Sequence, residues 1–182
     1  MEKTAPRGFF YFLESVYMEK INALNLKSPF ELIGSDWMLI TAEKEGKVNT
    51  MTASWGGMGV LWNKNVVFVF IRESRYTKEF VDSSDKFSLS FFGDGFKDKL
   101  TYLGRVSGRD ENKIEKTGLE VLYADGVPYF SQAETVIVCN KLYAQDLSEN
   151  GFISRELFEK MYPGGDIHTV YVAEIENVYK NS

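Results

Sequence analysis

Four polar residues that suit anion binding stand close together after an apolar segment of strand length. They are Arg72, Ser74, Arg75 and Thr77, and they follow the run VVFVFI. Guanidinium groups form charge-assisted hydrogen bonds with phosphate oxygens, and the backbone N–H groups at the start of a helix attract anions. The spacing therefore predicts a phosphate site where a strand ends and a helix begins. Ordinary surface charges are the alternative interpretation.

The preceding segment carries small side chains against which a flat ligand could lie. Thr52 and Ser54 alternate with Ala53 and Trp55, so the two hydroxyls share one face if the segment is a strand. Small hydroxylated side chains leave room for an aromatic ring to approach the backbone, although the same alternation fits the polar face of an ordinary strand. Trp55 suits the wall of a pocket and the protein core equally well.

The chain has one histidine and one cysteine, which argues against several kinds of site. Ser-His-Asp, Cys-His and multi-histidine metal schemes would all depend on His168, and none has a local signature. Cys139 lies in the apolar run TVIVC, where a buried thiol is expected. Aspartate and glutamate form no metal-loop pattern, so we predict no metal site.

Length and composition predict a single domain spanning residues 1–182. The chain is 44% hydrophobic and 26% charged, as in ordinary globular proteins, and its 15% aromatic content suits a β-rich core or a pocket for a planar ligand. A net charge of −5 argues against non-specific nucleic-acid binding, which needs a basic surface. The sequence contains neither a membrane-spanning apolar stretch nor a secretory signal pattern. We therefore expect a cytoplasmic protein that binds neither nucleic acid nor membrane.

Hydrophobic patterning and turn residues predict mainly β structure. Strands are expected at residues 37–42, 48–55, 66–72, 87–92, 134–144 and 167–179, with a polar turn at 43–47 that makes a hairpin of the first two, a glycine-rich turn after Trp55 and a polar turn at 63–65. Short helices are expected from an N-cap at Thr77 to Ser83, at 97–103, at 112–117 with a stop at Gly118, and near 155–161. Short turns between most strands favour antiparallel pairing in a closed or partly split barrel with short helices over its ends.

Residues 1–27 form an N-terminal extension rich in aromatic side chains. Phe12, Val16, Glu19 and Ala23 recur at a spacing that permits a helix, although apolar residues fall on several faces. So aromatic a segment is expected to pack across the barrel or against a second subunit. Residues 28–35 are predicted to be a connector.

Several motifs in consistent order resemble those of the flavin reductase-like family of FMN-binding split barrels, which includes NAD(P)H:flavin reductases and flavoredoxin. They are NTMTASWGGMGVLWNK, FIRESRYTKEF, SLSFF, SGRDENKIEKTGLE, LYAQDL and IHTVYVAEI. The resemblance implies an antiparallel, mainly β, Greek-key split β-barrel with short peripheral helices. It also implies a homodimer with FMN bound near the subunit interface.

The resemblance assigns the cofactor contacts to four segments. These are the strand residues Asn49, Thr50, Met51, Thr52, Ala53, Ser54 and Trp55, the phosphate cluster Arg72, Ser74, Arg75 and Thr77, the ring-bordering Phe91 and Phe92, and the loop residues Ser107, Gly108 and Arg109, from the same or the facing subunit. Two neighbours of these segments carry further expectations. Glu73 replaces a proline of many relatives and is expected to pair with an arginine, and Lys113 is expected to face solvent unless it reaches an anionic ligand.

The implied activity is reduction of FMN by NADH or NADPH. His168 stands where several related reductases carry a histidine on the nicotinamide side of the flavin, which makes it the candidate catalytic residue; an ordinary strand residue is the alternative. No G-x-G-x-x-G follows a strand, so the nicotinamide would be held without a dinucleotide-binding fold. The alternatives are a flavoredoxin-like FMN electron carrier that serves a redox protein partner, and a non-catalytic FMN-binding barrel.

Overall fold

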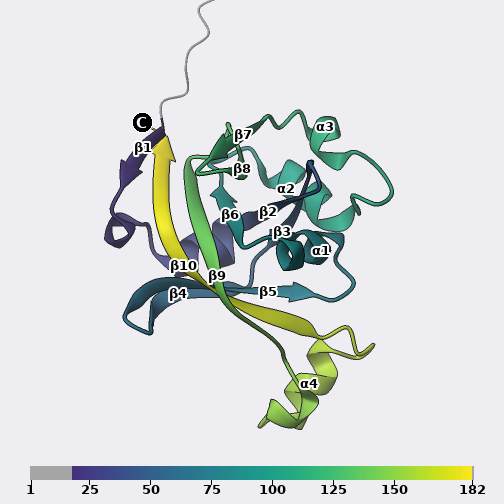
Figure 1. The fold of residues 1–182 in the computed structure, drawn as a ribbon. Helices are drawn as coiled ribbons and strands as arrows, with labels where there is room; N and C mark the ends of the chain where they lie inside the picture. Colours follow the sequence, from purple (N-terminus) through teal and green to yellow (C-terminus); the bar gives the residue numbers. More distant parts are fainter. Residues whose placement is uncertain (1–17, 182) are drawn as a thin grey trace, which may run out of the picture.

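The computed structural model describes residues 18–181, whose fold is a large antiparallel β-sheet with short helices around it (Figure 1). The order of the neighbouring strands is β3 (Lys47–Ala53), β2 (Met38–Lys44), β6 (Lys86–Phe91), β9 (Thr135–Asp146), β10 (His168–Asn181), β5 (Lys64–Arg72) and β4 (Gly56–Leu61). The eighth strand, β1 (Met18–Ile21), pairs with the C-terminal end of β10. The predicted mainly β, antiparallel fold class is confirmed.

The helices lie in two places (Figure 1). Helices α1 (Tyr76–Ser83), α2 (Lys97–Arg105) and α3 (Lys113–Thr117) gather around the β2–β3 end of the sheet, with α1 and α2 on opposite faces, and α4 (Arg155–Met161) lies on an arm that projects from the sheet. We call residues 147–167, between β9 and β10, the arm. The predicted helices at 97–103, 112–117 and 155–161 are confirmed, and Gly118 ends α3 with a φ of 64°.

The predicted hairpin of the first two long strands is confirmed. Strands β2 and β3 pair from Met38 opposite Ala53 to Lys44 opposite Lys47. Between them Glu45 and Gly46 have φ values of 52° and 75°, the left-handed conformation that a two-residue hairpin turn requires at both central positions. This hairpin fixes which residues of β3 point toward the core.

The glycine-rich turn predicted after Trp55 is wrong, because this segment forms strand β4. Strand β4 pairs with β5, and Gly56 lies opposite Val69. A Cβ atom on Gly56 would lie 2.6 Å from the carbonyl oxygen of Phe68, so glycine is needed there for the close approach of two backbones. The turn between β4 and β5 lies at Trp62 and Asn63, which have φ values of 52° and 57°, and so overlaps the polar turn predicted at 63–65.

Three further segments differ from the sequence-based predictions. Residues 18–21, within the stretch whose spacing permits a helix, form β1 because they pair with the end of β10; residues 1–17 lie outside the described residues. The predicted connector at 28–35 contains most of the π-helix Phe30–Asp36. Strands β7 (Val121–Ala124) and β8 (Val127–Phe130) form a small hairpin that was not predicted, and short 3-10 turns occur at Ala23–Asn25 and Glu149–Gly151.

Two hydrophobic clusters lie on opposite faces of the sheet. In β2, the neighbouring side chains Leu39 and Ile40 are both fully buried and belong to different clusters, as expected from strand alternation. Helix α1 packs on the cluster that contains Ile40 and the buried thiol of Cys139, and α2 and β8 pack on the other. The sheet is thus buried on both faces at its centre, which holds the strand ends rigidly.

The substitution Gly56→Ala should destabilise the fold, because the added methyl group would collide with the backbone of β5 rather than with a movable side chain. We expect a loss of about 1–3 kcal/mol in the free energy of unfolding, measured by urea denaturation. Gly34→Ala is the matched control, since nothing lies within 4 Å of its added Cβ. Equal stability of the two variants would contradict this account of β4.

Candidate functional site

The ends of β3, β5 and β10 meet beside the base of the arm and form a hollow of about 250 Å³. Antiparallel pairing of β10 with β5 places His168 opposite Arg72. The hollow is lined by Met51, Thr52, Ala53, Ser54, Trp55, Phe70, Arg72, Arg75 and His168. Residues from three predicted segments are thus brought together.

Strand β3 divides its predicted contact residues between the hollow and the interior. Thr50 is fully buried, and its hydroxyl lies 2.9 Å from Oγ1 of Thr41 and donates to the carbonyl oxygen of Ile40 at 3.0 Å. The Thr52 hydroxyl donates to the carbonyl oxygen of Leu100 at 2.5 Å. Both hydroxyls are therefore committed to the fold, and what the strand offers the hollow is chiefly its small side chains and the half-exposed Trp55.

Thr77 lies inside helix α1 rather than at its start, so the prediction that it is the N-cap is wrong. Arg75 is the N-cap, and its side chain makes no capping hydrogen bond. Thr77 is buried, and its hydroxyl oxygen accepts a hydrogen bond of 3.0 Å from Nδ2 of Asn49. This pair joins α1 to β3, and the predicted FMN contacts of Asn49 and Thr77 stay predictions.

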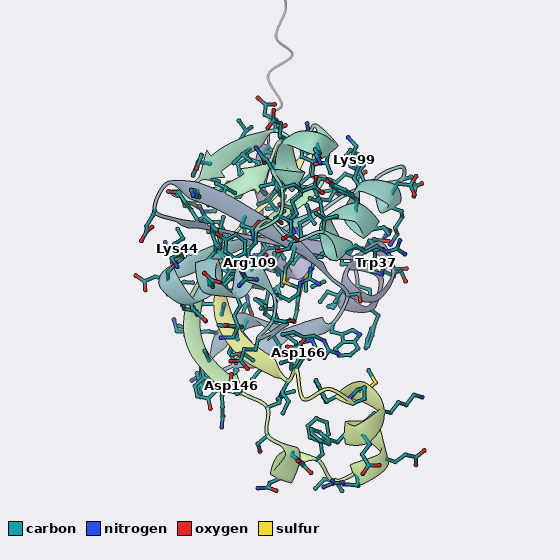
Figure 2. All side chains as sticks on the ribbon, turned by 90° about the vertical axis from the view of Figure 1, so that its right-hand side faces the viewer. Trp37, Lys44, Lys99, Arg109, Asp146 and Asp166 are labelled. Atoms are coloured by element: carbon teal, nitrogen blue, oxygen red, sulfur yellow. The ribbon has the colours of Figure 1, made fainter. Side chains whose placement is uncertain are left out.

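The donors of Ser74 are bound by a carboxylate of the protein itself. Asp166 accepts from the backbone N–H of Ser74 at 3.1 Å through Oδ1, and from its hydroxyl at 2.7 Å through Oδ2. Arg72 donates to the backbone carbonyl oxygens of Asp166 at 2.7 Å and Met161 at 3.2 Å. Figure 2 shows Asp166 at the junction where the arm leaves the body of the molecule. Two members of the predicted phosphate cluster therefore hold the arm.

Arg75 is the member of the cluster whose charged group has no partner within the described residues. In residues 18–181 no hydrogen bond or ion pair engages its guanidinium, which is half-buried at the hollow. Burial lowers the pKa of Arg75 from its usual value; the carboxylate of Asp166 opposes this effect and the charge of Arg72 adds to it. A half-buried cation without a partner binds an anion favourably, because folding has already removed part of the water around the cation. Glu73, expected to pair with an arginine, is exposed and forms no ion pair within the described chain.

His168 is a neutral imidazole that forms part of the wall of the hollow. It is 7% exposed, and its Nδ1 lies 2.9 Å from the hydroxyl oxygen of Tyr162. Its ring centroid is 5.1 Å from that of Trp55. Burial lowers the pKa of His168 from 6.5 to about 4; the charges of Arg72 and Arg75 add to this effect, and Asp166 opposes it. At neutral pH the residue is therefore a hydrogen-bonding group without charge.

The loop Ser107–Arg109 packs on α1 of the same chain. Arg109 donates to Oε1 of Glu79 at 2.5 Å, and its guanidinium lies 4.5 Å from the ring centroid of Tyr76. A Cβ atom on Gly108 would lie 2.3 Å from Oδ1 of Asn49. The Ser107 hydroxyl accepts from the backbone N–H of Arg109, which holds the turn. These contacts fix the loop against the N-terminal end of β3.

A second hollow, of about 410 Å³, lies between this loop, β3 and α1. Lys113 belongs to its lining and is buried, contrary to the expectation of a solvent-facing side chain. Its ammonium group donates to the carbonyl oxygens of Leu103 and Val106, both at 2.9 Å. Burial, and then the charge of Arg75, lowers the pKa of Lys113 to about 8. Arg75 and Lys113 thus lie near enough to affect one another, and each lines a different hollow.

Phe91 and Phe92 do not line either hollow. Phe91 belongs to the main hydrophobic cluster, and Phe92 packs with Phe96 and Phe130 in the other. Both side chains are nearly fully buried. Their predicted contact with a flavin ring stays a prediction, and their observed role is in the core.

The sequence matches the family described as "Flavin reductase like domain" over residues 30–182. The chain belongs to this family. This match covers the segments that form both hollows, including β3, the Arg72–Thr77 cluster, the loop Ser107–Arg109 and His168.

Solved structures with the same fold bear names of flavin-binding proteins. Flavoredoxin from Methanosarcina acetivorans is 24% identical, with a TM-score of 0.63 over 81% of this chain and 69% of that one. An FMN-binding domain of flavin reductases-like enzyme from Shewanella baltica is 16% identical, with a TM-score of 0.66 over 91% and 78%. An NADH:FAD oxidoreductase from Streptomyces globisporus is 14% identical, with a TM-score of 0.58 over 80% and 74%. At these identities the likeness establishes the fold of the flavin reductase-like domain.

An uncharacterized protein of Aeropyrum pernix is 30% identical over 103 residues, which are 55% of this chain and 39% of that protein. The matched part of this chain thus spans well under half of the length of that relative. No helix in the described part of the chain is long and apolar enough to cross a membrane.

Sequence reasoning missed two residues that shape this site of the flavin reductase-like domain. Asp166 and Tyr162 both lie on the arm and contact Ser74 and His168 respectively. Asp166 is 92 residues from Ser74, which hides their contact; the pairing of β10 with β5 brings the two together. Tyr162 is only six residues from His168, and this proximity in sequence was the available signal.

His168 should make the stability of the protein depend on pH between about 6.5 and about 4. Because its pKa is lowered in the folded state, the unfolded chain binds a proton more readily in this range, and folding loses stability as the pH falls. The measurement is urea denaturation of the wild type and of His168→Gln at several pH values. The wild type should lose stability relative to the variant as pH falls from 7 to 4; a constant difference between them would contradict a buried neutral histidine.

Proposed function

We propose that this chain binds FMN and acts as an FMN-dependent oxidoreductase that takes electrons from NADH or NADPH. The observation that carries the proposal is the half-buried guanidinium of Arg75, which has no partner in the described residues and lies beside a strand of small side chains. A phosphate would supply the missing anion, and a planar ring would fit along the strand. Membership of the flavin reductase-like family supports this assignment.

The residues present fit a phosphorylated cofactor with a planar ring. Arg75 would bind the phosphate, since charge-assisted hydrogen bonds to it contribute about 1.5–3 kcal/mol each, and Lys113 would add positive potential from the second hollow. Ala53 and Ser54 would leave space for the ring beside β3, with Trp55 at its edge. FMN, when bound, would supply the hydride-accepting chemistry.

The chain's own groups would bind and orient rather than transfer protons. His168 is neutral at pH 7 because of its lowered pKa, so it serves as a hydrogen-bonding partner for a nicotinamide. Ser74 contributes less to phosphate binding than the sequence suggests, since Asp166 already accepts from both of its donors. No general acid or base is required for hydride transfer, which agrees with the lack of a catalytic cluster in the described chain.

A homodimer is part of the proposal. The hollow beside β3 measures about 250 Å³, which is smaller than the roughly 300–1,000 Å³ of typical ligand sites, so a second subunit would complete it. Trp55, Val60 and Trp62, on β4 or next to it, are 42%, 73% and 56% exposed. Trp55 lines the incomplete site and Val60 and Trp62 lie at the far end of β4; exposed apolar side chains along one strand suit the interface of a symmetric dimer.

The second candidate function is that of an FMN electron carrier that serves a protein partner and ignores nicotinamides. It is favoured by the structural likeness to flavoredoxin. Both functions require the same FMN site, and they differ in whether a nicotinamide reaches the ring beside His168. A non-catalytic FMN-binding protein would share the site as well.

Replacing Arg75 should weaken FMN binding through loss of the phosphate contact. We expect Arg75→Ala to raise the Kd for FMN about tenfold or more, which corresponds to about 1.4 kcal/mol, while the Kd for riboflavin, which lacks the phosphate, stays within about twofold. Flavin fluorescence titration measures both. Arg155→Ala is the control, because this arginine is exposed on α4 and pairs there with Glu149 and Glu159. Equal losses for both flavins would place the phosphate elsewhere.

Anaerobic addition of NADH or NADPH to the FMN-loaded protein should bleach the absorbance of the flavin near 450 nm (about one hydride per FMN). Protein that retains FMN but keeps its colour with both nicotinamides would support the carrier instead. Protein that binds no FMN at all would overturn both candidate functions.

A further inference from the structure

Tyr162, whose hydroxyl group contacts His168, is held in place by contacts of its backbone and its ring. It caps the C-terminal end of α4, where its backbone N–H donates to the carbonyl oxygen of Phe158 at 2.8 Å. Its ring lies 5.7 Å from that of Phe158 and 5.8 Å from that of Phe152, between centroids. The guanidinium of Arg72 lies 5.2 Å from its ring centroid. Packing on several sides leaves the phenol few alternative rotamers.

The base of the arm is held by hydrogen bonds to the C-terminal end of β5 and to the residues that follow it. Arg72 donates to the carbonyl oxygen of Met161, next to Tyr162, and to that of Asp166, while Asp166 accepts from Ser74. The backbone N–H of Glu73 also donates to the carbonyl oxygen of Ile167, the residue before His168. Both partners of the Tyr162–His168 contact therefore have set positions before any ligand binds.

The hydrogen bond between Tyr162 and His168 can run in either direction, and the surroundings favour donation by the phenol. Burial raises the pKa of Tyr162, and Arg72 opposes this effect, so the phenol keeps its proton. Tyr162 is 7% exposed, and its hydroxyl has no other acceptor within residues 18–181. If Nδ1 carried the proton, the buried phenolic hydrogen would lose its partner, which is costly. Donation to Nδ1 requires the proton of the imidazole to lie on Nε2.

The other ring nitrogen is open to the hollow. Nε2 of His168 makes no hydrogen bond within the described chain. Among the described residues, Ser90 Oγ is the sole side-chain polar atom that is both fully buried and without a partner, so Nε2 is not fully buried. Nε2 therefore keeps contact with solvent at the hollow that His168 lines. A hydrogen on Nε2 makes this wall a neutral donor, which would bind a carbonyl oxygen.

We propose that Tyr162 is a positioning residue, which donates its hydroxyl hydrogen to Nδ1 of His168 and so fixes the histidine as a neutral Nε2–H donor facing the hollow. Under the proposed function, on which this last step rests, the acceptor is the carboxamide oxygen of the reduced nicotinamide. The charged groups that face the imidazole are Arg72 from β5, Arg75 from the start of α1 and Asp166 from the arm. Burial, together with two cations against one carboxylate, keeps the imidazole uncharged.

Nitrogen-15 NMR of the imidazole tests the positioning without any flavin or nicotinamide. Because the chain has one histidine, histidine-labelled protein from which any purification tag has been removed gives one set of ring signals. We expect a single Nε2–H tautomer in the wild type. In Tyr162→Phe, which keeps the ring and its packing, we expect the pKa of His168 to rise by roughly half a unit or more, since a hydrogen bond to the neutral form is lost.

Tyr143→Phe is the matched control, because its hydroxyl bonds to Gln145 and its ring packs on Trp62, away from the imidazole. It should leave the histidine signals unchanged. An Nδ1–H tautomer in the wild type would overturn the proposal even if Tyr162→Phe failed to fold. A pKa that falls or stays constant in Tyr162→Phe would overturn it as well, because the phenol would then accept from the histidine or not matter.

Steady-state kinetics test the role toward the nicotinamide. With FMN bound, Tyr162→Phe should raise the KM for the nicotinamide about threefold or more with a smaller change in kcat, as expected for weakened substrate orientation, and Tyr143→Phe should change neither. A KM unchanged by Tyr162→Phe would overturn the assigned acceptor. A wild type that does not oxidise NADH or NADPH would refute the reductase function, while the NMR result would still decide the role of Tyr162.

Discussion

The site depends on the register in which β10 pairs with β5. This ladder places His168 opposite Arg72 and continues to Glu174 opposite Val66. A shift of one residue would turn each side chain of β10 to the other face of the sheet, so His168 would leave the hollow and Tyr171 would leave the core. The buried valines of β5 and the fully buried Tyr171 make such a shift costly. The core therefore fixes the geometry of a site that lies at its edge.

The cations around the hollow differ in whether they have hydrogen-bond partners, and this difference determines which of them is available to a ligand. Arg72 is bound to backbone carbonyls of the arm, and Lys113 to carbonyls near the C-terminal end of α2. Cations at a helix C-terminus are stabilised there by the helix dipole. Arg75 has neither kind of partner within the described residues. A chain with a net charge of −5 thus keeps a local cation available at the hollow, and under the proposed function selectivity for an anionic ligand would follow from the position of this cation rather than from the overall charge.

The sequence predicted those parts of the fold and site that depend on local patterns. The β2–β3 hairpin, α4 and the stop at Gly118 follow from turn residues, polar spacing and glycine, and Arg72 and Arg75 were identified because they follow a strand. Strand β4 was missed because its glycines resemble a turn, and pairing with β5 outweighs that local preference. The hydrogen bonds of Ser74 and Thr77 to other parts of the chain were not predicted, for another reason. Their partners, Asp166 and Asn49, come from distant segments, and hydrogen bonds between distant segments leave no spacing pattern.

The two sides of the hollow come from different parts of the chain, and this separation bears on how its function is set. The strand side and Arg75 belong to the sheet and α1, which the hydrophobic core supports. The opposite wall is His168, the first residue of β10, whose Nδ1 contacts the hydroxyl of Tyr162 from the arm. In terms of the proposed function, changes in the arm would alter access and orientation of a nicotinamide while leaving the flavin contacts intact. A reductase and an electron carrier could therefore share the same sheet and differ chiefly in the residues that the arm presents to the ring.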